Sequence, residues 1–348
     1  MIKISQNIKL MKELSLAPGI SGFETEIEKI IRRELKDTAN EIETDKMGNL
    51  ICTKKGEEGA PSIMLASHMD EIGLMVKFID DNGYIKFATI GGINDQMLMN
   101  QTVTIHSESG EHIGVIGSKP PHVTKPEERK KVITYDDMFI DIGAKDKKEA
   151  ETMVAVGDAI TFNALFEEFP NNCIMGKALD NRIGCYVMIE VLKRVNTRAT
   201  VYGVGTVQEE VGLKGAKVTS FKLNPDYAFA LDTTLSGDHP GIKLEEAPCK
   251  LGNGPAVVLI DASGRGIITP KIIRDMLISA GDNENIDYQL EVSDGGTTDG
   301  TAIHLTREGI PTGVISVPTR YSHTPVSVAS MDDVEKTIQL IVAAINNL

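Results

Sequence analysis

Residues 62–70 read SIMLASHMD, and this stretch decides how the rest of the chain is interpreted. The run from Ser62 to Ala66 is apolar and is bounded by Pro61 and by a polar cluster. A short apolar run of this kind is typical of a strand buried on both faces of a parallel sheet. Similar runs recur at Val201 to Val207, Tyr227 to Leu231, Ala256 to Ile260 and Thr312 to Val317. We therefore expect a sheet that contains several parallel strands.

Helical patterns lie between these strand candidates. They cover Ile183 to Arg194, Pro270 to Ala280, Asp299 to Arg307 and Met331 to Leu348. Nearer the N-terminus, Ser21 and Glu24 match a capping box, and apolar residues follow at helical spacing up to Leu35. Strands that alternate with helices predict an α/β fold with helices on both faces of the sheet.

A different pattern occupies residues 72–163. Its strand candidates are short and partly alternating, at Val76 to Ile79, Tyr84 to Ala88, Gln101 to Ile105 and Ile113 to Gly117. Asn82-Gly83, between the first two, is a preferred dipeptide of tight hairpins. We predict a small inserted β-barrel-like domain over residues 72–163. The catalytic α/β domain would then consist of residues 1–71 and 164–348.

The composition excludes several classes of function. The chain has 348 residues, of which 36 are basic and 50 acidic, and a formal net charge of −14. Such a charge repels a phosphate backbone and an anionic membrane surface, so neither nucleic acid nor a membrane is expected as a partner. The four cysteines are far apart, and the N-terminus lacks the pattern of a signal peptide. A cytoplasmic location is expected.

Metal-ligand residue types follow four of the strand candidates. His68 with Asp70 and Glu209 with Glu210 follow two of them, Asp232 follows a third, and His323 comes shortly after the run that begins at Thr312. In open α/β sheets the binding crevice lies outside the carboxyl ends of the strands. Residues that are distant in sequence should therefore meet at one edge of the sheet.

Each of these residues also has a purely structural interpretation. A histidine after a buried strand is more often structural than a ligand. Asp180 directly precedes an apolar helical pattern and could be a helix N-cap. Glu209 and Glu210 could be an exposed acidic pair, and Asp232 could open an Asx turn. The metal interpretation is favoured because independent structural roles would not gather all of them on one edge of one sheet.

The residue types indicate which metal ions the site would bind and which role each residue would have. Two histidines with several carboxylates suit zinc or cobalt, with manganese as a further option, better than magnesium or calcium. Two ions about 3.5 to 4 Å apart need a bridging carboxylate, for which Asp180 is the candidate. Asp70 could accept the imidazole N–H of His68 that does not face the metal. Glu210 would bind metal, while Glu209 receives the proton of a metal-bound water.

Several strings of the sequence together resemble the M42 metallo-aminopeptidases, which include the tetrahedral TET particles and the glutamyl and deblocking aminopeptidases. These strings are SHMDEIG at 67–73, ALDNR at 178–182, VQEEVG at 207–212, ALD at 230–232 and RYSH at 320–323. They occur in order across nearly the whole chain, and GGTTDG at 295–300 belongs to the same match.

The resemblance implies a fold, a site and an assembly. The fold would be a dimetal-peptidase-like α/β sandwich. Two divalent ions per subunit would be held by His68, Asp180, Glu210, Asp232 and His323. Asp180 would bridge them, Glu209 would be the general base that activates a metal-bridging water, and Asp70 would orient His68. The resemblance also implies that the inserted domain mediates dimerisation and that dimers form a hollow tetrahedral dodecamer.

The predicted activity is hydrolysis of N-terminal residues from peptides. One alternative is another dimetal amidohydrolase, such as a carboxypeptidase or an N-deacylase, because that wider group uses similar ligands. An endoglucanase is disfavoured, because Glu209 and Glu210 are chain neighbours and can hardly flank a glycosidic bond with the roughly 5 to 9.5 Å separation such enzymes use. A non-enzymatic oligomeric scaffold would hold no stoichiometric metal.

The first side chain of the substrate is expected to bind near the loops after Asp232 and around Gly295 to Asp299. The second of these is predicted to form a tight turn between strand and helix, with Asp299 capping the helix. Neither loop contains a cluster of basic residues, although Lys214, Lys243 or Lys250 could reach the pocket. We therefore expect neutral, leucine-like residues to be preferred.

Overall fold

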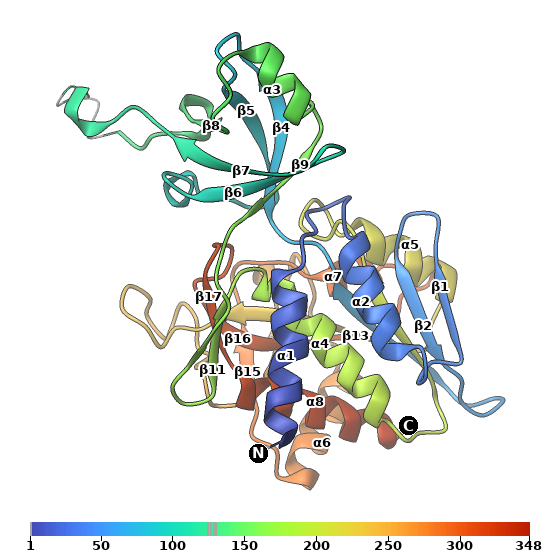
Figure 1. Ribbon diagram of the computed structural model, residues 1–348. Coiled ribbons are helices and arrows are strands. Elements are labelled where there is room, and N and C mark those ends of the chain that lie inside the picture. The colour runs from blue at the N-terminus through green and yellow to red at the C-terminus, as the bar shows by residue number, and fades with distance from the viewer. Residues whose placement is uncertain (1, 124, 126, 128–130) are drawn as a thin grey trace.

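The structure, a computed structural model, describes residues 2–123, 125, 127 and 131–348. Two β-structures organise it: an eleven-stranded sheet and a closed barrel (Figure 1). The barrel lies at one end of the molecule, and the sheet with its helices forms the larger body. This arrangement confirms the predicted fold class of an α/β body with a small barrel.

The middle of the large sheet is parallel. Its strands are β12 (Thr200–Thr206), β3 (Ser62–His68), β13 (Tyr227–Leu235) and β16 (Thr312–Arg320), in that order. Thr206 lies opposite His68, and Asp232 lies opposite Ser316. Because the strands run in the same direction, their carboxyl ends meet at one edge of the sheet, as the sequence predicts.

Antiparallel strands extend this centre on both sides. β2 (Leu50–Lys54) and β1 (Glu41–Thr44) follow β12, whereas β17 (Ser327–Ser330), β11 (Cys173–Gly176) and β10 (Glu167–Phe169) follow β16. β14 (Ala256–Ile260) was expected among the parallel strands, but it pairs antiparallel with β16 and parallel only with β15 (Gln289–Val292). The two strands therefore form a branch beside the site.

Helices cover both faces of the sheet (Figure 1). On one face lie α1 (Ile2–Leu16), α2 (Thr25–Leu35), α4 (Leu179–Arg194), α6 (Lys271–Glu284) and α8 (Met331–Asn346). On the other lie α5 (Lys214–Leu223) and α7 (Asp299–Ile303). Most of α4 is buried, because it contacts β3 and β13 on one side and α1 and α8 on the other. In the part of the chain described, each helix is too short or too polar to cross a lipid bilayer.

The predicted capping box at the start of α2 is wrong. Thr25 begins the helix, and the side chain of Glu24 makes no cap there. Instead, Ser21 Oγ donates a hydrogen bond of 2.6 Å to Asp70 Oδ2. Glu24 Oε1 accepts from the backbone N–H groups of Gly22 and Gln208. Both side chains are thus drawn towards the carboxyl edge of the sheet.

The barrel has its own apolar core. Its strands are β4 (Gly73–Ile79), β5 (Ile85–Ile90), β6 (Thr102–Ser107), β7 (Gly110–Gly117), β8 (Phe139–Asp141) and β9 (Ala159–Phe162), and α3 (Lys147–Met153) packs against them. Asn82-Gly83 does form the predicted turn between β4 and β5, where Gly83 has a φ of 88°. Short 3₁₀ helices occur at Asp95–Met97 (η1), Pro121–Val123 (η2), Tyr135–Asp137 (η4) and, in the large body, Ala262–Gly264 (η5).

Candidate active site and metal centre

The structure brings all five predicted metal ligands together at the carboxyl edge of the sheet. They form two groups, His68 with Asp180 and Asp232, and Asp180 with Glu210 and His323. Within each group the candidate ligand atoms lie within 4.8 Å of one another. Asp180 belongs to both groups, which is the position required of a bridging carboxylate.

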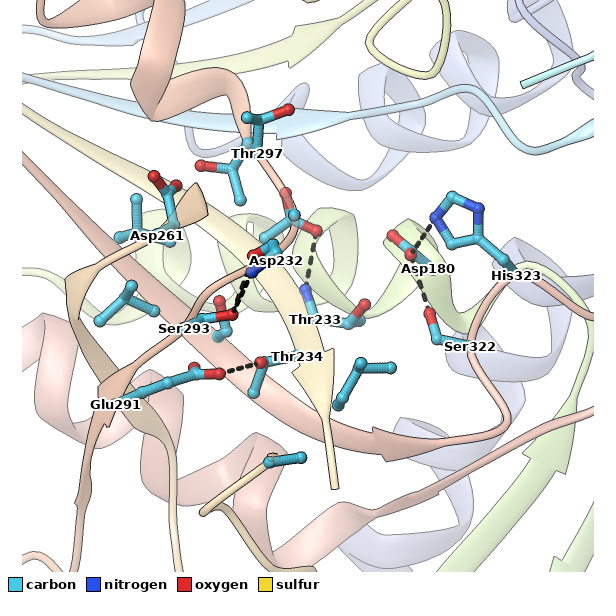
Figure 2. Close-up of a pocket in the computed structure, with 18 of the residues that line it drawn as sticks. Asp180, Asp232, Thr233, Thr234, Asp261, Glu291, Ser293, Thr297, Ser322 and His323 are labelled. Atoms are coloured by element: carbon cyan, nitrogen blue, oxygen red, sulfur yellow. Dashed lines mark hydrogen bonds and ion pairs between the residues drawn. The ribbon is translucent and has the colours of Figure 1, made fainter. Parts of the chain in front are cut away.

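Asp180 turns one carboxylate oxygen to each group. Oδ1 lies 3.3 Å from His68 Nε2. Oδ2 lies 3.5 Å from His323 Nε2 (Figure 2). Burial opposes ionisation, but the hydrogen bond to His68 and the nearby His323 lower the pKa of Asp180 to about 2. The Asp180–Asn181 peptide bond is cis.

Asn181, rather than Asp180, provides the helix-capping contact that was considered for this position. Asn181 Oδ1 accepts from Gly184 N–H at 2.9 Å, and its Nδ2 donates to the Leu231 carbonyl at 2.7 Å. These bonds fix the start of α4 against β13. The Asp180 carboxylate therefore remains available to the site.

His68 lies at the end of β3 and is 2% exposed. Its Nδ1 is 3.1 Å from the Asp70 carbonyl oxygen, so Nε2 faces the site, 3.8 Å from Asp232 Oδ1. Burial lowers the pKa of His68, but Glu209 and the other carboxylates around it raise that pKa well above the usual value. The imidazole is thus held in a strongly negative environment.

His323 is oriented by a residue from the loop that follows β5. Its Nδ1 lies 2.9 Å from the Gly92 carbonyl oxygen, and its Nε2 lies 4.0 Å from Glu210 Oε2. Burial and the Asp180 charge raise the pKa of Glu210 to about 7. Nothing in the sequence pointed to Gly92, because its contribution is a backbone carbonyl.

Asp70 has a different contact pattern from the one predicted. Its Oδ1 is 3.5 Å from His68 Nδ1, farther than its own carbonyl oxygen at 3.1 Å. The carboxylate instead accepts from the backbone N–H groups of Glu209 and Glu210, at 3.0 and 3.2 Å. Asp70 therefore fixes the backbone that carries both glutamates, while its carbonyl meets His68.

Glu209 projects into the same site. Its Oε2 lies 3.9 Å from His68 Nε2, and the side chain is 10% exposed. Burial raises the pKa of Glu209 well above its usual value, and the charges of Asp232 and Asp299 add to this effect against the opposing charge of His68. A buried carboxylate that is easily protonated can accept a proton during a reaction.

The residues present fit two divalent cations. Burial and neighbouring carboxylates raise the pKa of Glu210 and, strongly, that of Asp232, which shows how much negative charge is concentrated here. Divalent ions compensate such charge directly. The mixed set of imidazole nitrogens and carboxylate oxygens is the donor chemistry of transition-metal sites.

Asp299 does not cap α7 as predicted. Thr298 caps this helix, because its Oγ1 accepts from Gly300 N–H. The Asp299 carboxylate is buried and accepts a hydrogen bond of 2.5 Å from Thr206 Oγ1. This bond ties the start of α7 to the end of β12, just before the segment that carries Glu209.

A cavity of about 390 Å³ extends from these residues into the large body. As expected, it is lined by the segment after Asp232 and by the turn from Gly295 to Thr298 (Figure 2). Its walls also include residues of the β14–β15 branch that the sequence did not indicate. Among the described residues that line the cavity there is no lysine or arginine, so the basic residues considered from sequence do not reach it.

A parallel-centred α/β sheet with two clustered groups of histidines and carboxylates at its carboxyl edge is the arrangement expected of a metal-dependent hydrolase. The family model described as M42 glutamyl aminopeptidase matches residues 48–340. A putative aminopeptidase of Acetivibrio thermocellus is 40% identical over 339 residues, which cover 97% of each chain.

Solved structures agree with this match. The TET aminopeptidase of a marine-sediment archaeon of the Thaumarchaeota has a TM-score of 0.96 at 40% identity, over 99% of this chain and 97% of that one. The TET1 peptidase of Pyrococcus horikoshii, which can assemble into a tetrahedron or a large octahedral shell, has a TM-score of 0.89 at 36% identity, over 98% and 100% of the two chains. The chain therefore belongs to the M42 aminopeptidase family and is a metal-dependent aminopeptidase, a peptide hydrolase.

Proposed function

We propose that this aminopeptidase uses a dinuclear centre held by His68, Asp180, Glu210, Asp232 and His323, with Glu209 as general base. The observation that carries the proposal is the position of Asp180, whose two carboxylate oxygens lie 3.3 and 3.5 Å from the imidazoles of two separate groups. One carboxylate shared between two such groups is suited to bridge two ions.

The proposed metals are zinc or cobalt, with manganese as a further option, because the donors are imidazole and carboxylate. When bound, two such ions supply Lewis-acid polarisation of the scissile carbonyl and lower the pKa of the attacking water. Metal identity depends on availability as much as on these donors.

Glu209 would take the proton of the attacking water and deliver it to the leaving nitrogen of the peptide bond. Two features support this role: its side chain is 10% exposed beside the cavity, and its backbone N–H is held by Asp70. A fixed position matters because proton transfer requires hydrogen-bond distance to the reacting group.

Replacement of Glu209 by glutamine tests this role. We expect turnover of aminoacyl substrates to fall by about 10²- to 10⁴-fold, with both metal ions still bound. Glu308→Gln, at an exposed position away from the site, is the matched control and should behave like the wild type. Normal turnover of the Glu209 variant at full metal content would contradict the assignment.

We further propose that residues 72–163 form an inserted dimerisation domain between the two parts of the catalytic domain, residues 1–71 and 164–348. The separate core of the barrel and its exposed apolar side chains, among them Phe78 at 52% and Ile113 at 62%, support an interface there. By analogy with the tetrahedron of the Pyrococcus horikoshii peptidase, dimers would form a dodecamer. Light scattering after size exclusion would reveal the dodecamer, whereas a monomer would refute the proposed assembly.

A cytoplasmic location completes the proposal. Its support is the state of the cysteines: Cys52, Cys173, Cys185 and Cys249 are all free thiols, as is usual in a reducing compartment.

A further inference from the structure

Two acidic residues of the cavity are buried, and no lysine or arginine among the described residues lines the cavity beside them. Asp261 is 5% exposed and Glu291 is 3% exposed. Both line the cavity, on the side away from Asp180 and His323 (Figure 2). Asp261 Oδ2 and Glu291 Oε2 have no hydrogen-bond partner among the described residues. A buried carboxylate oxygen without a partner is costly and calls for an explanation.

The second oxygen of each carboxylate is firmly held. Glu291 Oε1 accepts a hydrogen bond of 2.6 Å from Thr234 Oγ1, and Asp261 Oδ1 accepts from the backbone N–H of Ile267. An uncharged Gln or Asn could accept these same bonds, so they do not account for the negative charges. What a carboxylate adds is a charged oxygen that is fixed in position and free to bind.

The two acids also affect each other. Burial raises the pKa of Asp261 and of Glu291, and the charge of Asp261 raises the pKa of Glu291 further. The two buried carboxylates repel each other, and no lysine or arginine among the described residues that line the cavity compensates their charge; His304 lowers the pKa of Asp261 against the effect of burial. A cationic ligand would compensate this charge, and would gain charge-assisted hydrogen bonds to both free oxygens.

The lining of the cavity that these acids share with the metal centre is partly aliphatic. It includes Leu235, Ala247, Val258 and Val314. An extended side chain that is apolar along its length and charged at its tip matches such a channel, because lysine and arginine stems pack well against aliphatic surface. A leucine side chain would leave the acids unpaired, and an acidic one would be repelled.

Two exposed residues that line the cavity are also negatively charged. Glu246 and Asp294 line the cavity as well, and both are exposed. With Asp261 and Glu291 they make the pocket acidic from its opening to its buried side. Such a field attracts cations and disfavours anions on approach.

We propose that this pocket binds the first side chain of the peptide and selects lysine or arginine there, with Glu291 and Asp261 as the specificity-determining residues. This inference rests on the proposed aminopeptidase function. It replaces the neutral, leucine-like preference expected from sequence, which relied on loops that do not include the β14–β15 branch.

The test compares lysyl, arginyl, norleucyl and glutamyl p-nitroanilides with the metal-loaded enzyme. Norleucine matches the lysine stem without its ammonium group. We expect kcat/KM for the lysyl or arginyl substrate to exceed that for the norleucyl substrate by about tenfold or more. A norleucyl substrate cleaved as well as both cationic ones would overturn the inference.

Variants then assign the selectivity to residues. Glu291→Gln and Asp261→Asn should each lower the ratio of lysyl to norleucyl kcat/KM by about tenfold, whereas Glu308→Gln should leave the ratio unchanged. An unchanged ratio in both pocket variants would refute the assignment. Thermal unfolding checks that each variant is folded, and if one is not, the other decides.

Binding separates failure of this inference from failure of the proposed function. If the metal-loaded enzyme cleaves none of the substrates, the proposed function fails. Calorimetry with L-lysinol and L-norleucinol, which contain no amide bond, still tests the pocket. Tighter binding of lysinol supports the inference, and equal or weaker binding refutes it.

Discussion

Replacement of Lys177 by methionine tests the buried ion pair that supports the site. Lys177 is 5% exposed and Glu71 is 2% exposed. Lys177 Nζ lies 2.6 and 2.7 Å from the two carboxylate oxygens of Glu71. Glu71 directly follows Asp70, whose carboxylate holds the backbone of Glu209 and Glu210. The pair therefore stabilises the segment on which the site is built.

The expected cost follows from what the substitution leaves behind. Loss of one partner of a buried ion pair costs about 3 to 5 kcal/mol, because the other charge remains buried. Glu71 would keep two weaker donors, Gly19 N–H at 3.1 Å and Arg182 Nη2 at 3.4 Å. We therefore expect a loss near the lower limit, about 3 kcal/mol, and a fall in unfolding temperature on the order of 6 °C.

The assay is thermal unfolding of Lys177→Met beside a matched control. Lys29→Met removes an ion pair of the same length, 2.7 Å to Glu26, whose side chains are 64% and 51% exposed. Exposed pairs contribute only about 0 to 1 kcal/mol, so this variant should unfold close to the wild type. Equal unfolding temperatures for the two lysine variants would refute the reasoning.

Two further predictions concern the metal centre and the acidic pocket. Chelation should lower the unfolding temperature, and re-addition of zinc or cobalt should restore it. The reason is that a ligand at 100 times its Kd stabilises the folded state by about 2.7 kcal/mol. An unfolding temperature that is the same with and without metal would contradict the presence of a metal site. Burial raises the pKa of Glu291, so its carboxyl group keeps its proton more readily in the folded state than in the unfolded state. Ionisation of Glu291 therefore lowers the stability of the protein as the pH rises through the raised pKa. Glu291→Gln, compared with the wild type at equal metal content, should therefore be of equal stability below the usual glutamate pKa of 4.5 and more stable at pH 8; a variant less stable than the wild type at pH 8 would exclude this explanation.

The sequence indicated the parallel strands and the convergence of the metal-ligand residues. An apolar run such as Ser62 to Ala66 indicates a buried strand by itself, because a strand that is buried on both faces has apolar side chains on both. The direction of parallel strands then brings His68 and Asp232 to the same edge, however far apart they are in the chain.

Side-chain partners could not be predicted in the same way. Ser21 and Asp299 matched local helix-capping patterns, yet both bond to residues that are distant in sequence, Asp70 and Thr206. A local motif indicates which hydrogen bonds a side chain could form, and the tertiary structure determines which of these hydrogen bonds it does form. Gly92 was not detectable at all, because any residue can offer a backbone carbonyl.

The acidic pocket was missed for a related reason. Glu291 lies in a short strand, β15, and Asp261 follows β14, where a polar residue at a strand end is unremarkable. Only the pairing of β14 with β16 brings these residues beside the cavity. Substrate selectivity therefore depends on a branch of the sheet whose position the sequence did not reveal.

The metal content per chain tests whether Asp180 bridges two ions. After chelation, reloading with zinc or cobalt and removal of free metal, elemental analysis should find two ions per wild-type chain. Asp180→Ala should retain fewer than one, because both groups share this residue. A wild type that binds one ion or none, or an Asp180 variant that still binds two, would contradict the account.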